Sequence, residues 1–205
     1  EVDPSDKILH TGGLLDEEST FTNSEVSFFA TEEEILNNEI SAVLLSAFIS
    51  CESELDITEY KITPEQFSDI YSAVLNRNPR FFYVKSFFAY YQDSQGYISK
   101  LYLYYRYDKN TSMEMLAEFD KAINAATSKV SANWSDMEKA LYIHDYLTRN
   151  CEYDYSYYGY SAYDALVNNT AVCQGYALGF KALANELGLQ CEVVTSWSLN
   201  HAWNM

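Results

Sequence analysis

The chain has 205 residues, and 13 Lys+Arg against 30 Asp+Glu give it a net charge of −17. That charge repels phosphate backbones and anionic membrane surfaces, and no basic patch offsets it, so nucleic acid is excluded as a partner. The most apolar stretch, residues 42–49, is far shorter than the roughly 20 residues of a membrane span. A hydrophobic share of 48% over this length is enough for one or two cored domains.

Three parts follow one another along the chain. Residues 1–30 are polar and acidic, and we expect a flexible N-terminal arm or a strand added to a sheet edge. Residues 31–130 are expected to form a small α+β domain, and residues 131–205 a second one. The chain starts at Glu1 rather than Met, so we expect a trimmed leader and an extracellular or cell-surface location.

The first domain carries clear start and turn signals. Thr31 before three glutamates predicts a helix from residue 32 to about 50, and alternation predicts a strand over 55–60. Thr63 followed by Pro64 and Gln66 predicts another helix start. Two aromatic strands are expected over residues 81–91 and 97–107, joined by a turn at 93–96. A helix over residues 111–130 follows them.

The second domain opens with a capping box at Ser135 and Glu138. The expected apolar face of that helix holds Leu141, His144 and Leu147, so His144 is interpreted as a structural histidine. A tyrosine-rich loop follows over 151–170, and it either lines a substrate groove or reflects β-prone packing. A helix from about Val172 and strands over 191–197 and from 201 complete this part, with Gly188 closing the helix.

The four cysteines are too few and too widely spaced for a zinc finger or a disulfide-stapled miniprotein. One disulfide among Cys51, Cys151 and Cys191 remains open. Cys173 and His201 lack further ligands at metal spacing, so we expect no metal and no cofactor.

Cys173 lies in the first turn of a predicted helix, where the dipole and unpaired N–H groups favour a thiolate. We expect Gly175 to keep this site open for an incoming carbonyl. A thiol nucleophile needs a base close in space, and His201 follows a short loop after the next strand. The competing interpretation is a small core cysteine and a histidine without a task.

Together these segments resemble the transglutaminase-like core, a papain-related cysteine enzyme fold, in its bacterial secreted form. The similarity spans roughly residues 55–205 and rests on short motifs: Val172-Cys173-Gln174-Gly175-Tyr176-Ala177, Glu186-Leu187-Gly188-Leu189, His201-Ala202-Trp203-Asn204, Glu138-Lys139-Ala140, Ile143-His144-Asp145-Tyr146-Leu147, Tyr153-Asp154, Tyr163-Asp164-Ala165-Leu166, Asn78-Pro79 and Phe82-Tyr83-Val84. The resemblance implies an α+β fold in which a helix bearing Cys173 packs on an antiparallel sheet.

The resemblance also implies acyl transfer at an amide of a peptide, protein or cell-wall component. Cys173 would be the nucleophile and His201 the base, and the substrate-binding residues are expected to be Gln174, Tyr163, Trp203 and Tyr153. The family's third residue is an Asp on the strand after the histidine. None of the four candidates, Asp136, Asp145, Asp154 and Asp164, matches that position, so we expect that strand to lie beyond Met205.

Two further readings remain open. A pseudoenzyme would keep the fold and use an aromatic groove to bind peptides or glycans. A purely structural surface domain would bury Cys173 fully and hold His201 out of its hydrogen-bond reach. The sequence leaves the choice of water or amine as acceptor open, and it gives no oligomeric state.

Overall fold

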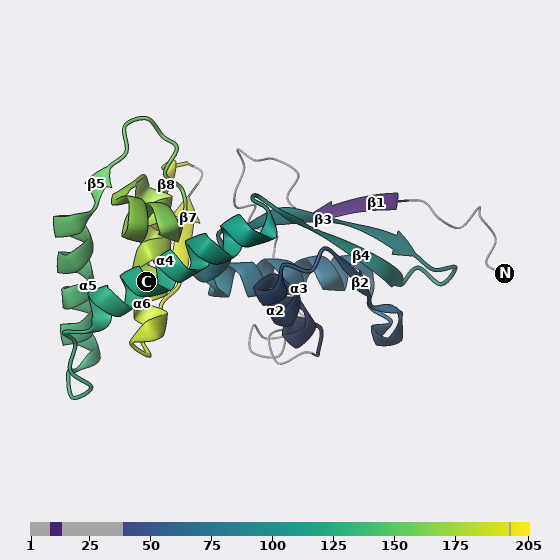
Figure 1. Cartoon of the computed structure of the whole chain (residues 1–205), viewed down its shortest axis with the longest axis horizontal. Helices are drawn as coiled ribbons and strands as arrows, with labels where there is room; N and C mark the ends of the chain where they lie inside the picture. Colours follow the sequence, from purple (N-terminus) through teal and green to yellow (C-terminus); the bar gives the residue numbers. More distant parts are fainter. Residues whose placement is uncertain (1–8, 14–38, 197) are drawn as a thin grey trace. The chain divides into compact units, whose positions relative to one another are not determined.

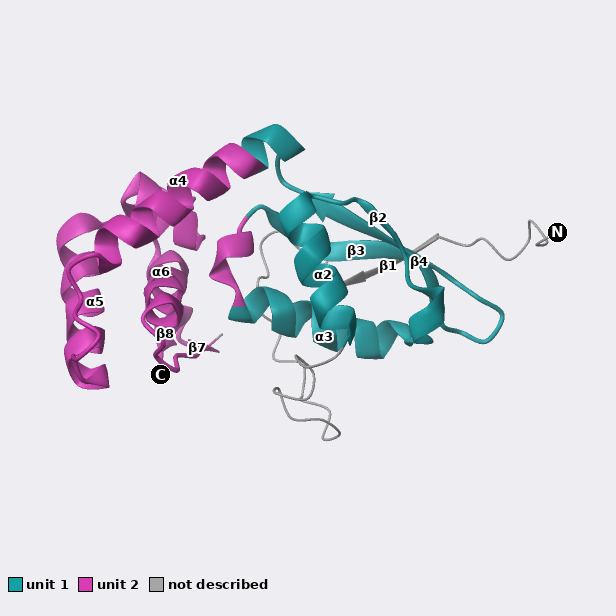
Figure 2. Ribbon diagram, turned by 60° about the horizontal axis from the view of Figure 1, so that its bottom comes forward, with its two compact units in different colours: residues 1–77, 83–112 teal, residues 78–82, 113–205 magenta. Residues whose placement is uncertain are grey.

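The computed structural model describes residues 9–13, 39–196 and 198–205. The chain divides into two compact units. Unit 1 comprises Glu1–Arg77 and Tyr83–Ser112, and unit 2 comprises Asn78–Phe82 and Met113–Met205 (Figure 2). No helix in the described ranges is both long and apolar enough to cross a membrane.

Unit 1 contains a four-stranded antiparallel sheet in the order β1-β3-β4-β2 (Figure 1). The predicted aromatic hairpin is confirmed, and the Asp93 carboxylate organises its turn by accepting the N–H groups of Gln95 at 2.9 Å and Tyr97 at 3.0 Å. Part of the predicted arm adds an edge strand, while residues 1–8 and 14–30 lie outside the description. The strands are β1 (Leu9–Gly13), β2 (Glu54–Asp56), β3 (Val84–Gln92) and β4 (Ile98–Tyr105).

Helices α2 (Glu39–Ser50) and α3 (Pro64–Arg77) belong to the same unit as this sheet. The predicted start of α3 is confirmed by reciprocal hydrogen bonds between Thr63 and Gln66, at 3.1 and 3.3 Å. The ring of Phe67 on α3 meets that of Phe88 on β3 edge to face, with centroids 4.7 Å apart, and this pair anchors helix to sheet. For α2, the predicted start at residue 32 lies outside the described residues.

The strand predicted over 55–60 is wrong beyond Asp56. The chain turns there into a short 3-10 helix, η2 (Thr58–Tyr60). The Asp56 carboxylate accepts the backbone N–H of Thr58 at 3.1 Å and its hydroxyl at 2.7 Å. Such a local bond gives the backbone an alternative to the sheet ladder, which ends the strand.

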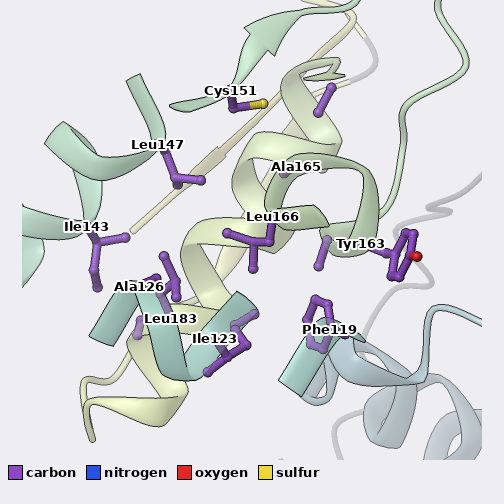
Figure 3. Close-up of a cluster of buried hydrophobic side chains, with 14 of the residues drawn as sticks. Phe119, Ile123, Ala126, Ile143, Leu147, Cys151, Tyr163, Ala165, Leu166 and Leu183 are labelled. Carbon is purple, nitrogen blue, oxygen red and sulfur yellow. The ribbon is translucent and has the colours of Figure 1, made fainter. Parts of the chain in front are cut away.

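Unit 2 is built around one apolar cluster, to which residues from Phe119 to Cys191 contribute buried side chains (Figure 3). Phe119 and Ile123 of α4 belong to it, so the continuous part of the unit starts at Met113, inside α4, and Asn78–Phe82 join it, whereas the sequence placed the boundary at 130/131. Its elements are η3 (Pro79–Phe81), α4 (Lys109–Thr127), α5 (Asp136–Asn150), β5 (Glu152–Tyr153), η4 (Asp164–Asn168), β6 (Thr170–Ala171), α6 (Cys173–Glu186), β7 (Val193–Ser196) and β8 (His201–Asn204).

The face that α5 buries differs from the predicted one. Its capping box at Ser135 is confirmed, but only Ile143 and Leu147 of α5 are buried. Leu141 is 60% exposed and His144 is exposed as well, so the interpretation of His144 as a structural histidine on a buried face is wrong. Apolar residues lie on two adjacent faces of this helix, one with Leu141 and one with Ile143. The face with Ile143 packs against the apolar cluster formed with α4, η4 and α6.

Helix α6 lies along the antiparallel hairpin of β7 and β8. The mixed α+β class expected from the sequence is therefore confirmed, with the Cys173 helix beside an antiparallel pair. Lys181 on α6 is 2% exposed, and its ammonium meets the Glu192 carboxylate at 2.8 Å. A buried ammonium needs such a partner, because leaving it unpaired costs several kcal/mol.

We therefore expect Glu192→Gln to lower the free energy of unfolding by about 1–2 kcal/mol, less than for a fully buried pair because Glu192 is half exposed. Urea denaturation measures this change. The exposed Glu114→Gln is the control, and an equal effect of both variants would contradict the expectation. Adding Lys181→Met to Glu192→Gln should restore stability, since the orphaned charge is then gone.

Candidate active site around Cys173

Cys173 is the first residue of α6, and its side chain is half-buried. The N-cap residue is Val172, with φ −82 and ψ 177, and its side chain makes no capping hydrogen bond. In α5, by contrast, the Ser135 hydroxyl accepts the N–H of Glu138 at 3.3 Å. The N–H groups of the first turn of α6 and the positive dipole end therefore face acceptors other than an N-cap side chain, such as a phenol, a thiolate or an oxyanion.

Gly175 serves close packing rather than access. A Cβ at this position would lie 2.7 Å from the carbonyl oxygen of Gly159 and 2.7 Å from the Cβ of Ala171. The expected role of Gly175, keeping space for an incoming carbonyl, is therefore wrong. Its missing side chain lets α6 approach the backbone of residues 159–161, which fixes the start of the helix next to that segment.

Tyr153 lies beside Cys173. Parallel pairing of β5 with β6 sets Tyr153 opposite Ala171, two residues before the thiol. Partial burial raises the pKa of the Tyr153 phenol, and the negative charge of a Cys173 thiolate raises it further, while the backbone N–H of Cys173 acts in the opposite direction. The phenol is thus held neutral and close to the start of α6, with 42% of the residue exposed.

The segment that follows Tyr153 is organised by one carboxylate. Asp154 is 7% exposed, and its carboxylate accepts the backbone N–H groups of Ser156, Tyr158 and Gly159, each at 2.8 Å. The Ser156 hydroxyl and these N–H groups lower the pKa of Asp154 to about 2. The sequence signal for this role is a general one, since Asp side chains often bond the backbone N–H two residues further on.

A pH dependence of this segment follows. The folded-state pKa of Asp154 lies below its ordinary value of about 3.9. The carboxylate therefore stabilises the segment above about pH 4, and that contribution is lost as the pH falls through about 2. We expect the carboxyl carbon of Asp154 to titrate near pH 2 by NMR, and a midpoint near 4 would contradict this. At pH 7, Asp154→Asn should speed amide exchange at Ser156 and Tyr158, whereas the exposed Asp69→Asn should not.

His201 begins β8 and lies toward the Cys173 end of α6. Asn204 on β8 donates to the carbonyl of Ala177 on α6 at 2.9 Å. The next residue, Met205, forms backbone hydrogen bonds with Glu192. The Glu192 carboxylate in turn pairs with Lys181, which lies one helical turn after Ala177 on α6. Strand β8 therefore runs toward the C-terminal end of α6, and stepping back from Asn204 to His201 leads toward Cys173.

The side chains of Cys173 and His201 are not joined by a hydrogen bond in the part of the chain that the structure describes. Ala202 is buried and Asn204 points to α6, so alternation along β8 turns His201 and Trp203 to the other face. The exposed imidazole stacks on Trp203, with ring centroids 6.0 Å apart. The structure thus places the two residues at one end of α6 without pairing them.

The remaining predicted substrate-binding residues separate into two groups. Gln174 follows Cys173 and is half-buried, as is Trp203 on β8. Tyr163 instead belongs to the core of unit 2. Its ring packs against Phe82 at a centroid distance of 4.8 Å, and its hydroxyl donates to the Glu118 carboxylate. Tyr163 is therefore placed to support the fold, not to face a ligand.

All four cysteines are free thiols in the structure, including the three for which a disulfide stayed open. Burial raises the pKa of the Cys151 and Cys191 thiols. It also raises the pKa of Cys51, which is only half-buried. In the described ranges, no three His, Cys, Asp or Glu side chains gather as a metal-binding group.

A pocket of about 190 Å³ lies at the other end of α6. It includes Asn185 and Glu186 from the last turn, about 18 Å from Cys173 at 1.5 Å per residue, and the Arg80–Asp120 ion pair. This pocket is distinct from the Cys173 site.

Residues 121–205 match the family model of the transglutaminase-like superfamily. The comparison with curated proteins gives no match. The matched range contains the Cys173 helix, the Tyr153 segment and His201, and it falls within unit 2. It is shorter than the similarity over 55–205 suggested by the motifs. The resemblance is confirmed for this part of the chain: residues 121–205 are similar to the transglutaminase-like superfamily.

Proposed function

We propose that unit 2 is a thiol enzyme that transfers an acyl group from an amide through a covalent intermediate on Cys173. The observation that carries this proposal is the half-exposed thiol in the first residue of α6, where Val172 supplies no side-chain cap, inside the range matched by the transglutaminase-like model. A helix start without a side-chain cap is suited to both the thiolate and the oxyanion of the addition step.

In the first half-reaction, the Cys173 thiolate attacks the carbonyl carbon of the amide and a tetrahedral oxyanion forms. The backbone N–H of Cys173, released from the Tyr153 phenol, donates to that oxygen. His201, after turning from Trp203 toward α6, protonates the nitrogen as the C–N bond breaks and the amine leaves. Catalytic hydrogen bonds are often long or poorly aligned in ligand-free structures and tighten with substrate bound, and here the His201 ring has to leave Trp203 to form one.

In the second half-reaction, water or an amine attacks the thioester carbonyl, His201 takes its proton, and the Cys173 thiolate leaves. We favour water, and hence a peptidase or amidase, on the resemblance to bacterial members; cross-linking is the lesser option. An extracellular or cell-surface location remains part of this proposal.

The test uses para-nitrophenyl acetate as acyl donor, with the acetylated residue mapped by peptide mass. We expect stoichiometric acetylation of Cys173 that Cys173→Ala removes without changing urea unfolding. Cys51→Ala is the matched control, since Cys51 is also half-buried. A mixed peptide library then distinguishes water addition from amine incorporation by product mass. Equal acetylation of Cys51 and Cys173 would overturn the proposal.

A pseudoenzyme that binds peptides or glycans is the second candidate. The lack of a hydrogen bond between Cys173 and His201, within the described residues, and the exposed tyrosines favour it. It predicts ligand binding that Cys173→Ala leaves unchanged, together with a Cys173 thiol no more reactive than Cys51.

A further inference from the structure

Five tyrosines from the end of β5 to residue 160 are exposed, and we call residues 153–160 the tyrosine loop. Tyr155 and Tyr158 are 81% and 84% exposed. The chain buries tyrosine completely where packing needs it, as at Tyr71 and Tyr83. The alternative of β-prone packing for this loop is therefore wrong, and its aromatic surface faces solvent. The five are Tyr153, Tyr155, Tyr157, Tyr158 and Tyr160.

The backbone of the tyrosine loop is preformed. The Asp154 carboxylate holds the N–H groups of Ser156, Tyr158 and Gly159, and the Tyr157 N–H bonds to the Asp154 carbonyl at 3.3 Å. Tyr157 has φ +62, a conformation that a bulky residue adopts only when its surroundings impose it. Rings carried on such a backbone bind a ligand with little loss of entropy.

The loop also borders the Cys173 site. It leaves β5 as an open arc (Figure 1) and returns where the Gly159 carbonyl accepts the N–H of Val172 at 2.9 Å. Val172 directly precedes Cys173. A chain that lies across the exposed rings is thereby led to the start of α6.

The charge around the loop has one sign. Residues 150–180 contain three acids, Glu152, Asp154 and Asp164, and neither Lys nor Arg. The nearest cations in the sequence are already paired: Arg149 meets Asp145 at 3.2 Å, and Lys181 meets Glu192 at 2.8 Å. Tyrosine faces attract cations, and the net charge of −17 strengthens that preference.

We propose that the tyrosine loop binds a peptide segment with Arg or Lys side chains, whose cationic groups lie on the exposed rings while an adjacent amide reaches Cys173. This substrate class rests on the proposed function, whose nucleophile it serves. The basic side chains are held for recognition and do not react. Charge complementarity favours this occupant over a neutral glycan, since a glycan would gain nothing from the acidic surroundings.

The test measures binding to the full chain carrying Cys173→Ala, so that no turnover occurs. The probes are a fluorescent Arg-containing peptide and its citrulline counterpart, which has nearly the same shape but no charge, followed by anisotropy. We expect the Arg peptide to bind about tenfold more tightly, and added salt to reduce this preference. Tyr155→Ala with Tyr158→Ala should abolish the preference, and the two Phe substitutions should retain most of it because the rings remain. Tyr107→Ala, an exposed tyrosine of unit 1, is the control.

Equal binding of the two peptides, a preference insensitive to Tyr155 and Tyr158, or tighter binding of a neutral oligosaccharide would each overturn the proposal. Acetylation of Cys173 in the wild-type chain is measured separately. Acetylation without Arg preference refutes the substrate class alone, whereas Arg preference without acetylation refutes the thiol-enzyme function.

Discussion

Replacing His201 with alanine is expected to slow acetylation of Cys173 by at least about a hundredfold at pH 7. A positioned general base typically contributes a factor of about 100 to 10,000, because it holds the thiolate and protonates the leaving group. Strand β8 sets His201 toward the Cys173 end of α6, and its exposed ring is free of core packing. The alanine variant should therefore fold normally, as urea denaturation can verify.

The matched control for His201 is His144→Ala. His144 is also exposed in unit 2, and its imidazole lies 3.4 Å from the carboxylate of its neighbour Asp145. We expect no change in acetylation from it. Exogenous imidazole should partly restore the rate of the His201 variant. If the His201 and His144 variants acetylate Cys173 equally fast, His201 is not the base.

Gly175→Ala is expected to lower the free energy of unfolding by about 2–3 kcal/mol, as overpacking of a close contact does. The new Cβ would lie 2.7 Å from the Gly159 carbonyl oxygen. A backbone carbonyl cannot relieve this clash by changing rotamer, as a long side chain can. Urea denaturation gives the magnitude. The tyrosine loop should also shift, because Gly159 closes it.

Gly179→Ala on the same helix provides a graded comparison. Its nearest obstacles are side-chain carbons, Ala165 Cβ at 2.9 Å and Leu147 at 3.6 Å, which can yield more readily than a carbonyl. We expect a smaller loss of stability than for Gly175→Ala. A Gly175→Ala variant as stable as the wild-type chain would contradict the close approach of α6 to residues 159–161.

Local sequence signals predicted several element ends well. Thr63 with Gln66 and Ser135 with Glu138 start helices by hydrogen bonds within four residues, and Asp93 does the same for a turn. Such contacts need no knowledge of the rest of the fold. The position of Cys173 at the first residue of α6 was predictable for the same reason, together with the motif around it.

Features decided by distant contacts were missed. The choice between two apolar faces of α5 depends on η4 and α6, and neither is visible in the helix itself. The sequence around Gly175 indicates an open site. Only the three-dimensional structure shows that the backbone of residues 159–161 packs against this glycine. Tyr163 looked like other tyrosines of its segment, and only the contacts with Phe82 and Glu118 assign it to the core.

For the candidate site, the sequence names residues but not their geometry, and the catalytic roles of those residues stay predictions. Sequence order indicated Cys173 and His201, and the family match covers both. The orientation of His201 depends on which residues of β8 face α6, and the Asn204 bond to Ala177 decides that. The role of Asp154 as organiser of the tyrosine loop required the three N–H groups that converge on its carboxylate.

The most direct test of Cys173 as an activated nucleophile compares the alkylation rates of all four thiols in the folded wild-type chain at pH 6, mapped by peptide mass. Cys51 is the internal reference because it is half-buried like Cys173 and follows the end of α2 rather than opening a helix, whereas Cys151 and Cys191 are buried. We predict that Cys173 is labelled at least about tenfold faster than Cys51. Labelling of Cys173 at the rate of Cys51 or below would contradict the thiol-enzyme function.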